Sequence, residues 1–382
     1  MPTTMPIPRP SHKKKEGAQT DLFRAQMLAW YDTHARVLPW RVSPSAGPCF
    51  TANPYHVWLS EVMLQQTTVQ AVIPYFGKFV DKWPSVHDLA MASSEEVMTA
   101  WAGLGYYARA RNLHKCAQVV SRENKGKFPN TLEELKKLPG VGDYTAAAIA
   151  AIAFDLPATV IDGNVDRVIS RYFAVTDPLP GSKPEIRALA AGLAEGRTDR
   201  PGDFAQSMMD LGATVCIPKN PRCDLCPVRD GCAGRAQGIA AELPAKAPKK
   251  ARPQRWGLIY WITNPAGDAV LLERRPDTGM LGGMVGLPTT EWADRPVIKG
   301  RKKPDIMDYV TDRYPGLERV RDNPGAIRHT FTHFDLDLIG VVGKAKKGFV
   351  AEPGQFWHPL AELSEIGFPT VFKKFVNLCI LK

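Results

Sequence analysis

Residues 138–167 read LPGVGDYTAAAIAAIAFDLPATVIDGNVDR, and the rest of the chain is organised around this stretch. Gly140 and Gly142 flank Val141 in a turn that we predict to be too tight for side chains at both ends, because glycine alone reaches positive φ without steric strain. The segment Thr145–Phe154 is almost devoid of polar residues and predicts a buried helix. The free N–H groups and the positive dipole end of that helix point back at the turn, which is therefore a candidate anion site.

Asp162 lies in the loop that follows this helix. One interpretation is a pair of helices that only pack, with Asp162 capping a helix at Asn164–Phe173. The whole pattern is far more specific than a lone glycine turn, and it resembles the helix-hairpin-helix of the endonuclease III superfamily of DNA glycosylases. The resemblance implies that the amides of residues 140–142 hold a DNA phosphate and that Asp162 is catalytic.

The composition is that of a globular protein with a polyanionic partner. The 382 residues suffice for two domains, and a hydrophobic share of 44% and a charged share of 23% are ordinary for globular proteins. The net charge of +10 and the pI of about 9.2 suit a partner such as DNA. No apolar run is long enough to span a membrane, and Met1–Gly17 lacks the hydrophobic centre of a signal peptide. We therefore predict a disordered basic tail at 1–17 and a cytoplasmic, nucleoid-associated protein.

A second segment, Val57–Gly77, holds Glu61 as its only charged residue. As one helix it would be buried nearly all round, because Leu59, Val62 and Val69 add apolar side chains to its other faces. Burial raises a carboxyl pKa above the reference of about 4.3, which is how a general acid for neutral pH arises. A glutamate satisfied by an arginine or a helix N-terminus is the alternative. The segment resembles the catalytic-glutamate helix of the MutY adenine glycosylases.

Four of the seven cysteines cluster as Cys216-x6-Cys223-x2-Cys226-x5-Cys232. The clustering and the odd total fit metal ligation in a reducing cytoplasm better than a disulfide framework. Zinc would satisfy the count, although zinc sites more often pair two short C-x2-4-C knuckles. The spacing resembles the [4Fe-4S] loop of the endonuclease III superfamily, which implies an iron-sulfur cluster held by the four thiolates in a structural role.

A basic, proline-rich linker at 241–254 precedes a segment of different composition. There, Trp256–Thr263 and Ala269–Arg275 predict a β-hairpin. This α+β segment resembles the Nudix-like C-terminal domain of MutY proteins. A Nudix hydrolase needs a G-x5-E-x7-R-E-x2-E-E helix to hold Mg²⁺, and nothing between Gly286 and Pro324 matches, so we predict binding without hydrolysis. Other predicted elements are strands at His329–Val342 and Gln355–His358 and helices at Lys303–Tyr314 and near the C-terminus.

The segment His329–His333 reads His-Thr-Phe-Thr-His. It resembles the Phe-Ser-His loop with which MutY proteins contact 8-oxoguanine, so the resemblance implies lesion contacts from Phe331, Thr332 and His333. Thr332 stands in place of the serine, keeping the hydroxyl and adding a methyl group. Taken alone, His333 is typical of an ordinary strand histidine.

The resemblance to MutY-type adenine DNA glycosylases covers nearly the whole chain from Leu22. The predicted fold is a mostly α helix-hairpin-helix glycosylase domain at 18–240 with its iron-sulfur loop at 216–232, followed by a Nudix-like α+β domain at 255–382. The implied activity is excision of adenine opposite 8-oxoguanine or guanine in double-stranded DNA by a monomer. Glu61 would protonate N7 of adenine, and Asp162 would stabilise the oxocarbenium-like sugar.

The resemblance implies further site residues. Tyr144 and Asn164 match pocket residues that support the two carboxylates. Arg41, Gln66 and Tyr106 match contacts to the flipped base and the lesion.

Two alternatives stay open. A bifunctional endonuclease III-type glycosylase and lyase needs a nucleophilic lysine two residues after Gly142, where this chain has Tyr144. Members of the MutY family often carry lysine where this chain has Asp166, and an acid there weakens the case for Schiff-base chemistry. A non-catalytic iron-sulfur DNA-binding protein would share the basic charge and the cluster, but it would not need Glu61 as the only charge in a buried helix.

Overall fold

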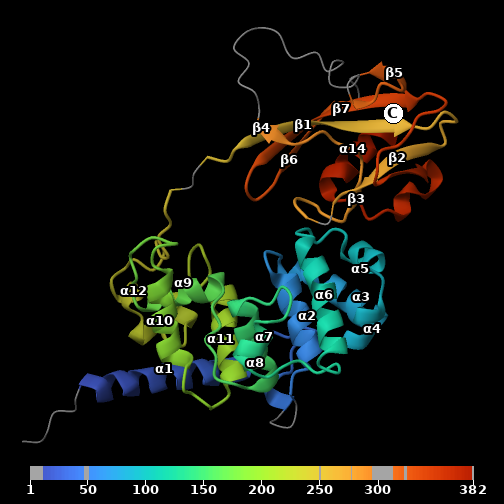
Figure 1. Ribbon diagram of the computed structural model, residues 1–382. Coiled ribbons are helices and arrows are strands. Elements are labelled where there is room, and N and C mark those ends of the chain that lie inside the picture. The colour runs from blue at the N-terminus through green and yellow to red at the C-terminus, as the bar shows by residue number, and fades with distance from the viewer. Residues whose placement is uncertain are drawn as a thin grey trace, which may run out of the picture. The chain divides into compact units, whose positions relative to one another are not determined.

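The computed structural model describes residues 12–46, 51–248, 251–276, 278–294, 313–321 and 325–380. Contacts divide the chain into two compact units (Figure 1). The first comprises residues up to Met91 together with Asn112–Pro248, and the second comprises Ala92–Arg111 together with residues from Lys249 onward. The sequence prediction had assigned Ala92–Arg111 to the helical domain.

The first unit is helical. Its elements are α1 (His12–His34), η1 (Pro44–Ala46), α2 (Pro54–Leu64), α3 (Val69–Lys82), α4 (Val86–Met91), most of α6 (Ala108–Arg122), α7 (Leu132–Leu135), α8 (Asp143–Phe154), α9 (Gly163–Tyr172), α10 (Lys183–Ala194), α11 (Pro201–Thr214), η2 (Cys223–Leu225), η3 (Arg229–Gly231) and α12 (Ala233–Ala236).

α1 begins within the predicted tail. Its first residue is His12, so the helix includes residues 12–17, while residues 1–11 lie outside the described part of the chain. The prolines stop at Pro10, and the lysines, glutamate, alanine and glutamine that follow are good helix formers.

The segment Val57–Gly77 forms two helices instead of the single helix predicted from its apolar pattern. α2 ends at Leu64 and α3 begins at Val69. Between them, Gln66 adopts a positive φ of 57°, which a helix does not accommodate. The Thr68 side chain then accepts a hydrogen bond from Ala71 N, so a threonine cap starts the second helix.

α8 packs on both α2 and α11. Residues 145–151 of α8 are all buried, which confirms the predicted buried helix. The small side chains let its backbone come close to its neighbours: a Cβ at Gly202, in the first turn of α11, would lie 2.6 Å from the carbonyl oxygen of Ala151. This close packing brings residues from the three helices together.

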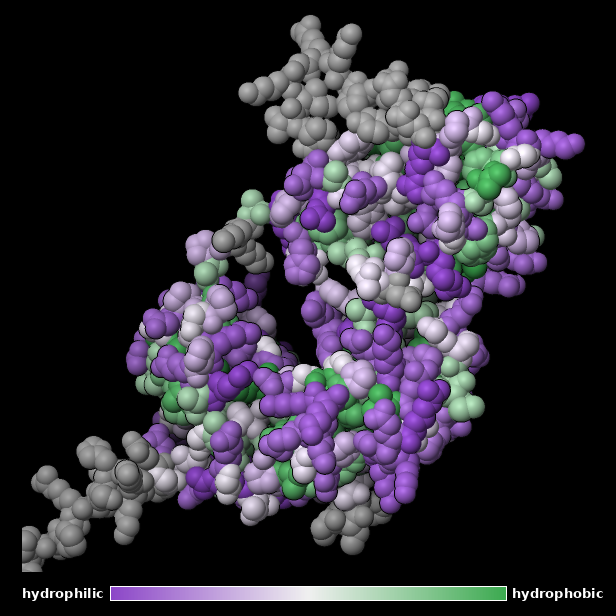
Figure 2. Space-filling model, in the orientation of Figure 1, coloured by the Kyte–Doolittle hydropathy of each residue, from purple (hydrophilic) through white to green (hydrophobic). Residues whose placement is uncertain are grey.

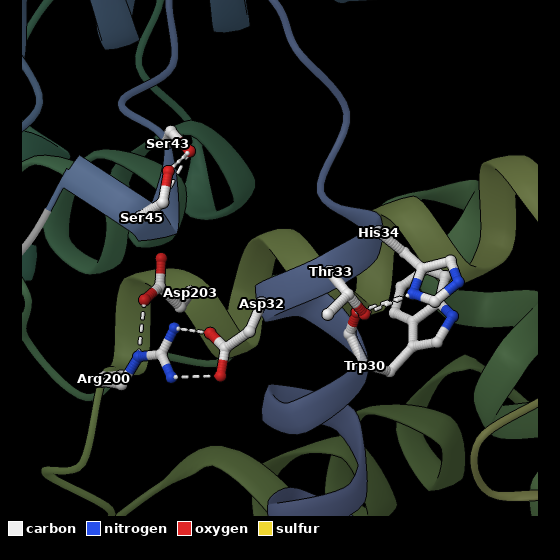
Figure 3. Close-up of polar contacts among 8 residues, drawn as sticks. All are labelled: Trp30, Asp32, Thr33, His34, Ser43, Ser45, Arg200 and Asp203. Carbon is white, nitrogen blue, oxygen red and sulfur yellow. Dashed lines mark hydrogen bonds and ion pairs between the residues drawn. The ribbon is translucent and has the colours of Figure 1, made fainter.

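Ion pairs tie α1 to the beginning of α11 (Figure 3). Arg200 lies between Asp32 of α1 and Asp203 of α11, with Nη2 2.5 Å from Asp32 Oδ1 and Nε 2.7 Å from Asp203 Oδ2. Arg24 of α1 makes a further pair with Asp199, at 2.9 Å. These contacts hold the end of α1, from which the chain continues towards Trp40 and Arg41.

The second unit is an α+β domain around one sheet of eight strands, ordered β3-β2-β1-β7-β5, with β4 on β1, β6 on β7 and β8 on β2. β1 and β7 are parallel, and the other pairs are antiparallel. Its elements are α5 (Ser94–Trp101), β1 (Gln254–Thr263), β2 (Ala269–Arg274), β3 (Val285–Gly286), β4 (Ala293–Asp294), β5 (Leu317–Arg321), β6 (Ala326–Thr330), β7 (Asp335–Ala345), β8 (Gln355–Pro359), η4 (Leu360–Glu365) and α14 (Thr370–Ile380).

Both faces of this sheet are buried along β1. Ile259 and Trp261 belong to one core, which α14 covers with Phe372 and Phe375. The alternate residues of β1 belong to a second core on the opposite face, together with Tyr314. The predicted hairpin of β1 and β2 is confirmed by their antiparallel pairing. The helix predicted at Lys303–Tyr314 lies almost wholly outside the described residues.

The helices do not suggest a membrane span. Within the described ranges, none is both long enough and apolar enough to cross a bilayer. In the view of Figure 2, hydrophilic residues cover most of the visible surface of each unit, with hydrophobic residues in small patches.

Candidate active site

The glycine turn differs at its two ends. Gly140 has a φ of +75°, and a Cβ there would lie 2.6 Å from the Cβ of Asn112, so glycine is required. Gly142, at φ −92° and ψ −177°, is ordinary extended backbone, and a Cβ would meet nothing within 4 Å. The prediction of a tight turn is therefore wrong at Gly142. This residue is the N-cap of α8 without a side-chain hydrogen bond to the helix, and the N–H groups of the first turn are the donors that the predicted anion site would use.

Glu61 lies on α2 with only 5% of its surface exposed. Its side chain is hydrogen-bonded to Tyr144 of α8, whose hydroxyl donates to Oε2 at 2.7 Å. Burial raises the pKa of the Glu61 carboxyl, and the charge of Asp162 raises it further, while the Tyr144 hydrogen bond and Arg41 oppose the shift. Burial and the neighbouring Glu61 also raise the pKa of Tyr144, which keeps that hydroxyl a donor. The site therefore holds a carboxyl biased towards its protonated form.

Arg41 is held by a carboxylate that the sequence analysis missed. Asp210 of α11 is fully buried, and its Oδ2 lies 2.8 Å from Nη1 of Arg41. Its Oδ1 accepts from Nε of Arg36 at 2.7 Å, and its Oδ2 also accepts from the backbone N–H of Arg36 at 2.9 Å. A signal was present, because Asp210 stands in an apolar helix much as Glu61 does. The two arginines neutralise Asp210, and Arg41 is thereby oriented beside Glu61.

A cavity of about 310 Å³ lies beside α11, and Ser43, Arg200 and Asp203 (Figure 3) are among the residues that line it. Gln206, one helical turn before Asp210, also lines this cavity and is 5% exposed. In the described part of the chain its Oε1 has no hydrogen-bond partner. Among the described residues, Oε1 of Gln206 is therefore a buried hydrogen-bond acceptor without a donor.

Asp162 is the N-cap of α9, so the predicted cap is present in the structure. Its Oδ1 accepts from the N–H groups of Asn164 at 2.9 Å and Val165 at 2.8 Å. Its Oδ2 accepts from Nδ2 of Asn164 at 2.8 Å. Three donors and a helix N-terminus stabilise negative charge on this side chain. The charge of the same carboxylate raises the pKa of both Glu61 and Tyr144, so the cap of α9 acts electrostatically on the buried glutamate.

Arg167 connects this cap to the cysteine loop. Its Nη2 donates to Oδ1 of Asn164 at 2.9 Å, and its Nε donates to the carbonyl of Cys216 at 2.7 Å. Asp166, one residue earlier, is half-buried, and burial raises the pKa of its carboxyl. The acid at this position therefore lies partly inside the fold instead of presenting a full negative charge to a DNA backbone.

The four predicted ligand cysteines line a single cavity. Arg171 borders the same cavity and is 1% exposed; its Nη1 donates to Sγ of Cys216 at 3.4 Å, and its carbonyl accepts from Sγ of Cys232 at 3.4 Å. None of the four is in a disulfide. Four free thiols and a buried cation thus line one cavity, and cysteine thiolates are the usual ligands of an iron-sulfur cluster.

The remaining predicted binding residues are divided between the two units. Gln66 is exposed in the turn between α2 and α3. Tyr106 belongs to the second unit, where it is 47% exposed and its hydroxyl lies 3.0 Å from Oγ1 of Thr332. Phe331 is partly buried, and Thr332 and His333 are exposed in the turn between β6 and β7.

Three family models match the chain. Residues 59–193 match the model described as HhH-GPD superfamily base excision DNA repair protein, and residues 259–378 match a NUDIX domain. The third, the iron-sulfur binding domain of endonuclease III, matches residues 216–232. Both predicted domain folds and the predicted [4Fe-4S] cofactor are thereby confirmed. We propose that the four cysteines of the matched loop are its ligands.

Loss of a single ligand should be visible in the metal content. Purified protein should be yellow-brown with about four irons per chain. Cys226→Ser should lose most of the iron and the visible absorbance, because a thiolate ligand is removed. The matched control, Cys379→Ser, lies in α14 and should keep both. Stoichiometric zinc with no visible absorbance would contradict the assignment.

Similar proteins cover most of the chain. Adenine DNA glycosylase of Homo sapiens is 35% identical over 95% of this chain and 75% of its own length. That of Buchnera aphidicola subsp. Baizongia pistaciae is 29% identical over 94% of this chain and 97% of its own length. Among solved structures, a thermostable thymine-DNA glycosylase covers 58% of this chain and 98% of its own, with 27% identity and a TM-score of 0.50. The chain belongs to the adenine DNA glycosylase family of the HhH-GPD superfamily.

Proposed function

We propose that this protein removes adenine from double-stranded DNA where adenine is mispaired with 8-oxoguanine or guanine, and that it acts as a monomer. The observation that carries the proposal is the buried Glu61 with its Tyr144 hydrogen bond, together with the capped carboxylate of Asp162, whose charge acts on the Glu61 pKa. A buried acid beside a stabilised carboxylate is the arrangement that cleaves glycosidic bonds. A purely structural DNA-binding protein has no use for a carboxyl that burial biases towards protonation.

The proposed reaction divides the work between the two carboxyl groups. Adenine leaves the base stack, at a cost of a few kcal/mol, to reach the enclosed site. Glu61 donates its proton to N7 of adenine, and the bond from N9 to the sugar breaks with its electron pair going to the base. Asp162 stabilises the positive charge that develops on the sugar. A water molecule then forms the bond to C1′ through its oxygen, and the proton that it loses returns to the Glu61 carboxylate. The amides at the start of α8 hold a backbone phosphate.

Arg41 and Tyr144 orient the acid. Arg41, fixed by Asp210, lies close enough to Glu61 to oppose its pKa shift. Tyr144 donates to Oε2 only, so Oε1 of Glu61 is left to carry and direct the proton. The Tyr144 hydrogen bond restricts the rotamer of the carboxyl group, and positioning of this kind is part of how an enclosed site gains rate.

The test is base release from duplexes that contain a single A:8-oxoguanine, A:G, A:T or 8-oxoguanine:C pair. We expect adenine from the first two and no base from the others. Because Tyr144 stands where a lyase has lysine, we also propose that the enzyme is monofunctional, so strands should break only after added alkali or heat. Strand cleavage at the rate of base release, with a borohydride-trapped adduct, would refute the monofunctional assignment.

We further propose that Phe331, Thr332 and His333 read the lesion. 8-Oxoguanine differs from guanine at O8 and N7–H, so discrimination depends on few hydrogen bonds. Thr332→Ala should lower the preference for A:8-oxoguanine over A:G by about 2- to 13-fold, since one hydrogen bond contributes about 0.5–1.5 kcal/mol. The rate on A:G should change far less. Thr332→Ser, which keeps the hydroxyl, is the matched control and should keep the preference; an unchanged preference in Thr332→Ala would remove Thr332 from the reader.

A further inference from the structure

The predicted reader is the tip of a β-hairpin with an aromatic base. β6 and β7 are antiparallel neighbours, and the four residues 331–334 connect them. The N–H of Phe331 donates to the carbonyl of Phe334 at 2.9 Å, which closes the turn. Thr332 and His333 are exposed, whereas Phe334 is 3% exposed in the core beneath. The polar tip is therefore oriented by the two phenyl rings at its base.

A tryptophan from a distant part of the chain contacts both of these rings. The ring of Trp292 lies 5.6 Å from that of Phe331 and 6.3 Å from that of Phe334, between centroids. The two phenyl rings are 5.0 Å apart, and His329 packs edge-on against Phe331 at 4.6 Å. These separations are those of favourable aromatic pairs. Trp292 is thus the member of the cluster that does not belong to the hairpin.

Trp292 itself is held in place from several sides. It directly precedes β4, which pairs with the beginning of β1. A Cβ at Gly257 of β1 would lie 3.2 Å from Cδ1 of the indole, so the ring sits close against that strand. The guanidinium of Arg275 lies 4.9 Å from the ring centroid as a cation–π contact. A ring confined in this way makes a firm support for its neighbour Phe331.

The indole nitrogen adds a second observation. Nε1 of Trp292 is buried and, in the described part of the chain, has no hydrogen-bond partner. The indole is therefore retained for its aromatic contacts and not for a polar one. A smaller aromatic ring would lose contact area here but no hydrogen bond.

We propose that Trp292 is a positioning residue for lesion specificity: it supports Phe331 and so fixes the Thr332-His333 tip against the base opposite adenine. This inference rests on the proposed reading of 8-oxoguanine by the hairpin tip. Hydrogen bonds weaken steeply with angle, so a tip that tilts loses contacts to O8 and N7–H without losing its side chains. The Trp292 side chain does not belong to the catalytic unit, so its removal should alter preference and not the chemical step.

The experiment compares full-length variants in single-turnover base release from A:8-oxoguanine and A:G duplexes. Trp292→Ala should lower the A:8-oxoguanine preference by about 2- to 13-fold, the effect of one aromatic pair worth about 0.5–1.5 kcal/mol. The change should appear in the dissociation constant for 8-oxoguanine DNA, with the maximal rate on A:G unchanged. Trp292→Phe should restore most of the preference. Trp357→Ala is the matched control, because Trp357 packs on the core of the opposite sheet face.

The outcomes separate the inference from the proposed function. If wild type shows no preference for A:8-oxoguanine over A:G, the reader proposal itself fails. If wild type has the preference and Trp292→Ala keeps it, only the positioning role of Trp292 is overturned. The same holds if Trp357→Ala lowers the preference as much as Trp292→Ala, because general destabilisation of the domain would then explain both. Thermal unfolding of each variant shows whether the domain is folded in the assay.

Discussion

Glu61→Gln should release adenine from an A:8-oxoguanine duplex about 10²- to 10⁴-fold more slowly than wild type, the usual contribution of a positioned general acid. Glutamine keeps the shape of the side chain and can accept the Tyr144 hydrogen bond through its amide oxygen. It has no proton of suitable acidity for N7 of adenine. The variant should therefore bind the mispair normally and fail at the chemical step. Single-turnover base release, with binding measured separately, distinguishes the two.

A matched control is Glu133→Gln, an exposed glutamate in the first turn of α7. It makes the same change of side chain at the surface of the first unit and should leave the rate within about twofold, because surface substitutions are usually mild. A rate for Glu61→Gln within threefold of wild type would remove Glu61 from the mechanism. Wild-type base release should also fall as the pH rises through the raised pKa of Glu61, because the protonated form is the donor.

Glu61→Gln should remain folded, so a loss of rate would not result from unfolding. The folded pKa of Glu61 lies above its unfolded value of about 4.3, so its stabilising contribution is complete below that pH and is lost as the pH rises through the folded pKa. Glutamine undergoes no such loss. At neutral pH Glu61→Gln should be at least as stable as wild type, as urea unfolding would measure.

Local pattern was enough to find both carboxylates and the cysteine loop. Glu61 was identified as the only charge in an apolar segment, and Asp162 by its place after the glycine turn and the buried helix. Features of this kind lie within about one helix length, where spacing and polarity can be seen directly in the sequence. The pairing of Glu61 with Tyr144 across 83 residues came only from the resemblance to the family.

Long-range pairing is what the sequence could not show. Asp210 contacts Arg36 and Arg41, which lie 174 and 169 residues earlier, and no local spacing indicates such partners. Its burial in an apolar helix was visible, yet nothing identified the cations that neutralise it. Trp292 is a similar case, since its role depends on strands β1, β4 and β7 lying next to one another. The single helix predicted for Val57–Gly77 was wrong for a different reason. Its apolar pattern continues across the break between α2 and α3, and Thr68 was not recognised as a helix N-cap.

Asp162→Asn should be nearly inactive in base release while remaining folded. Two explanations of this residue make opposite predictions. As a cap alone, asparagine serves about as well as aspartate, because its amide oxygen can accept from the N–H groups of Asn164 and Val165. As the group that stabilises the sugar cation, Asp162 needs its negative charge, which asparagine lacks. Because asparagine can still cap α9 but carries no charge, the variant distinguishes a capping role from an electrostatic role.

One contact of the cap does change in Asp162→Asn. Oδ2 now accepts from Nδ2 of Asn164, and an amide NH₂ in its place would set two donors against each other. The expected loss of about one hydrogen bond, 0.5–1.5 kcal/mol, should lower the free energy of unfolding slightly without unfolding the protein.

Removing the charge should instead reduce the rate by about 10²-fold or more, as loss of a preorganised electrostatic contact does. Glu185→Gln, at an exposed acid in the first turn of α10, removes one negative charge at a comparable helix start and should leave the rate nearly unchanged. If Asp162→Asn and Glu185→Gln release adenine equally well, Asp162 acts only as a cap, and the sugar cation must be stabilised by another group.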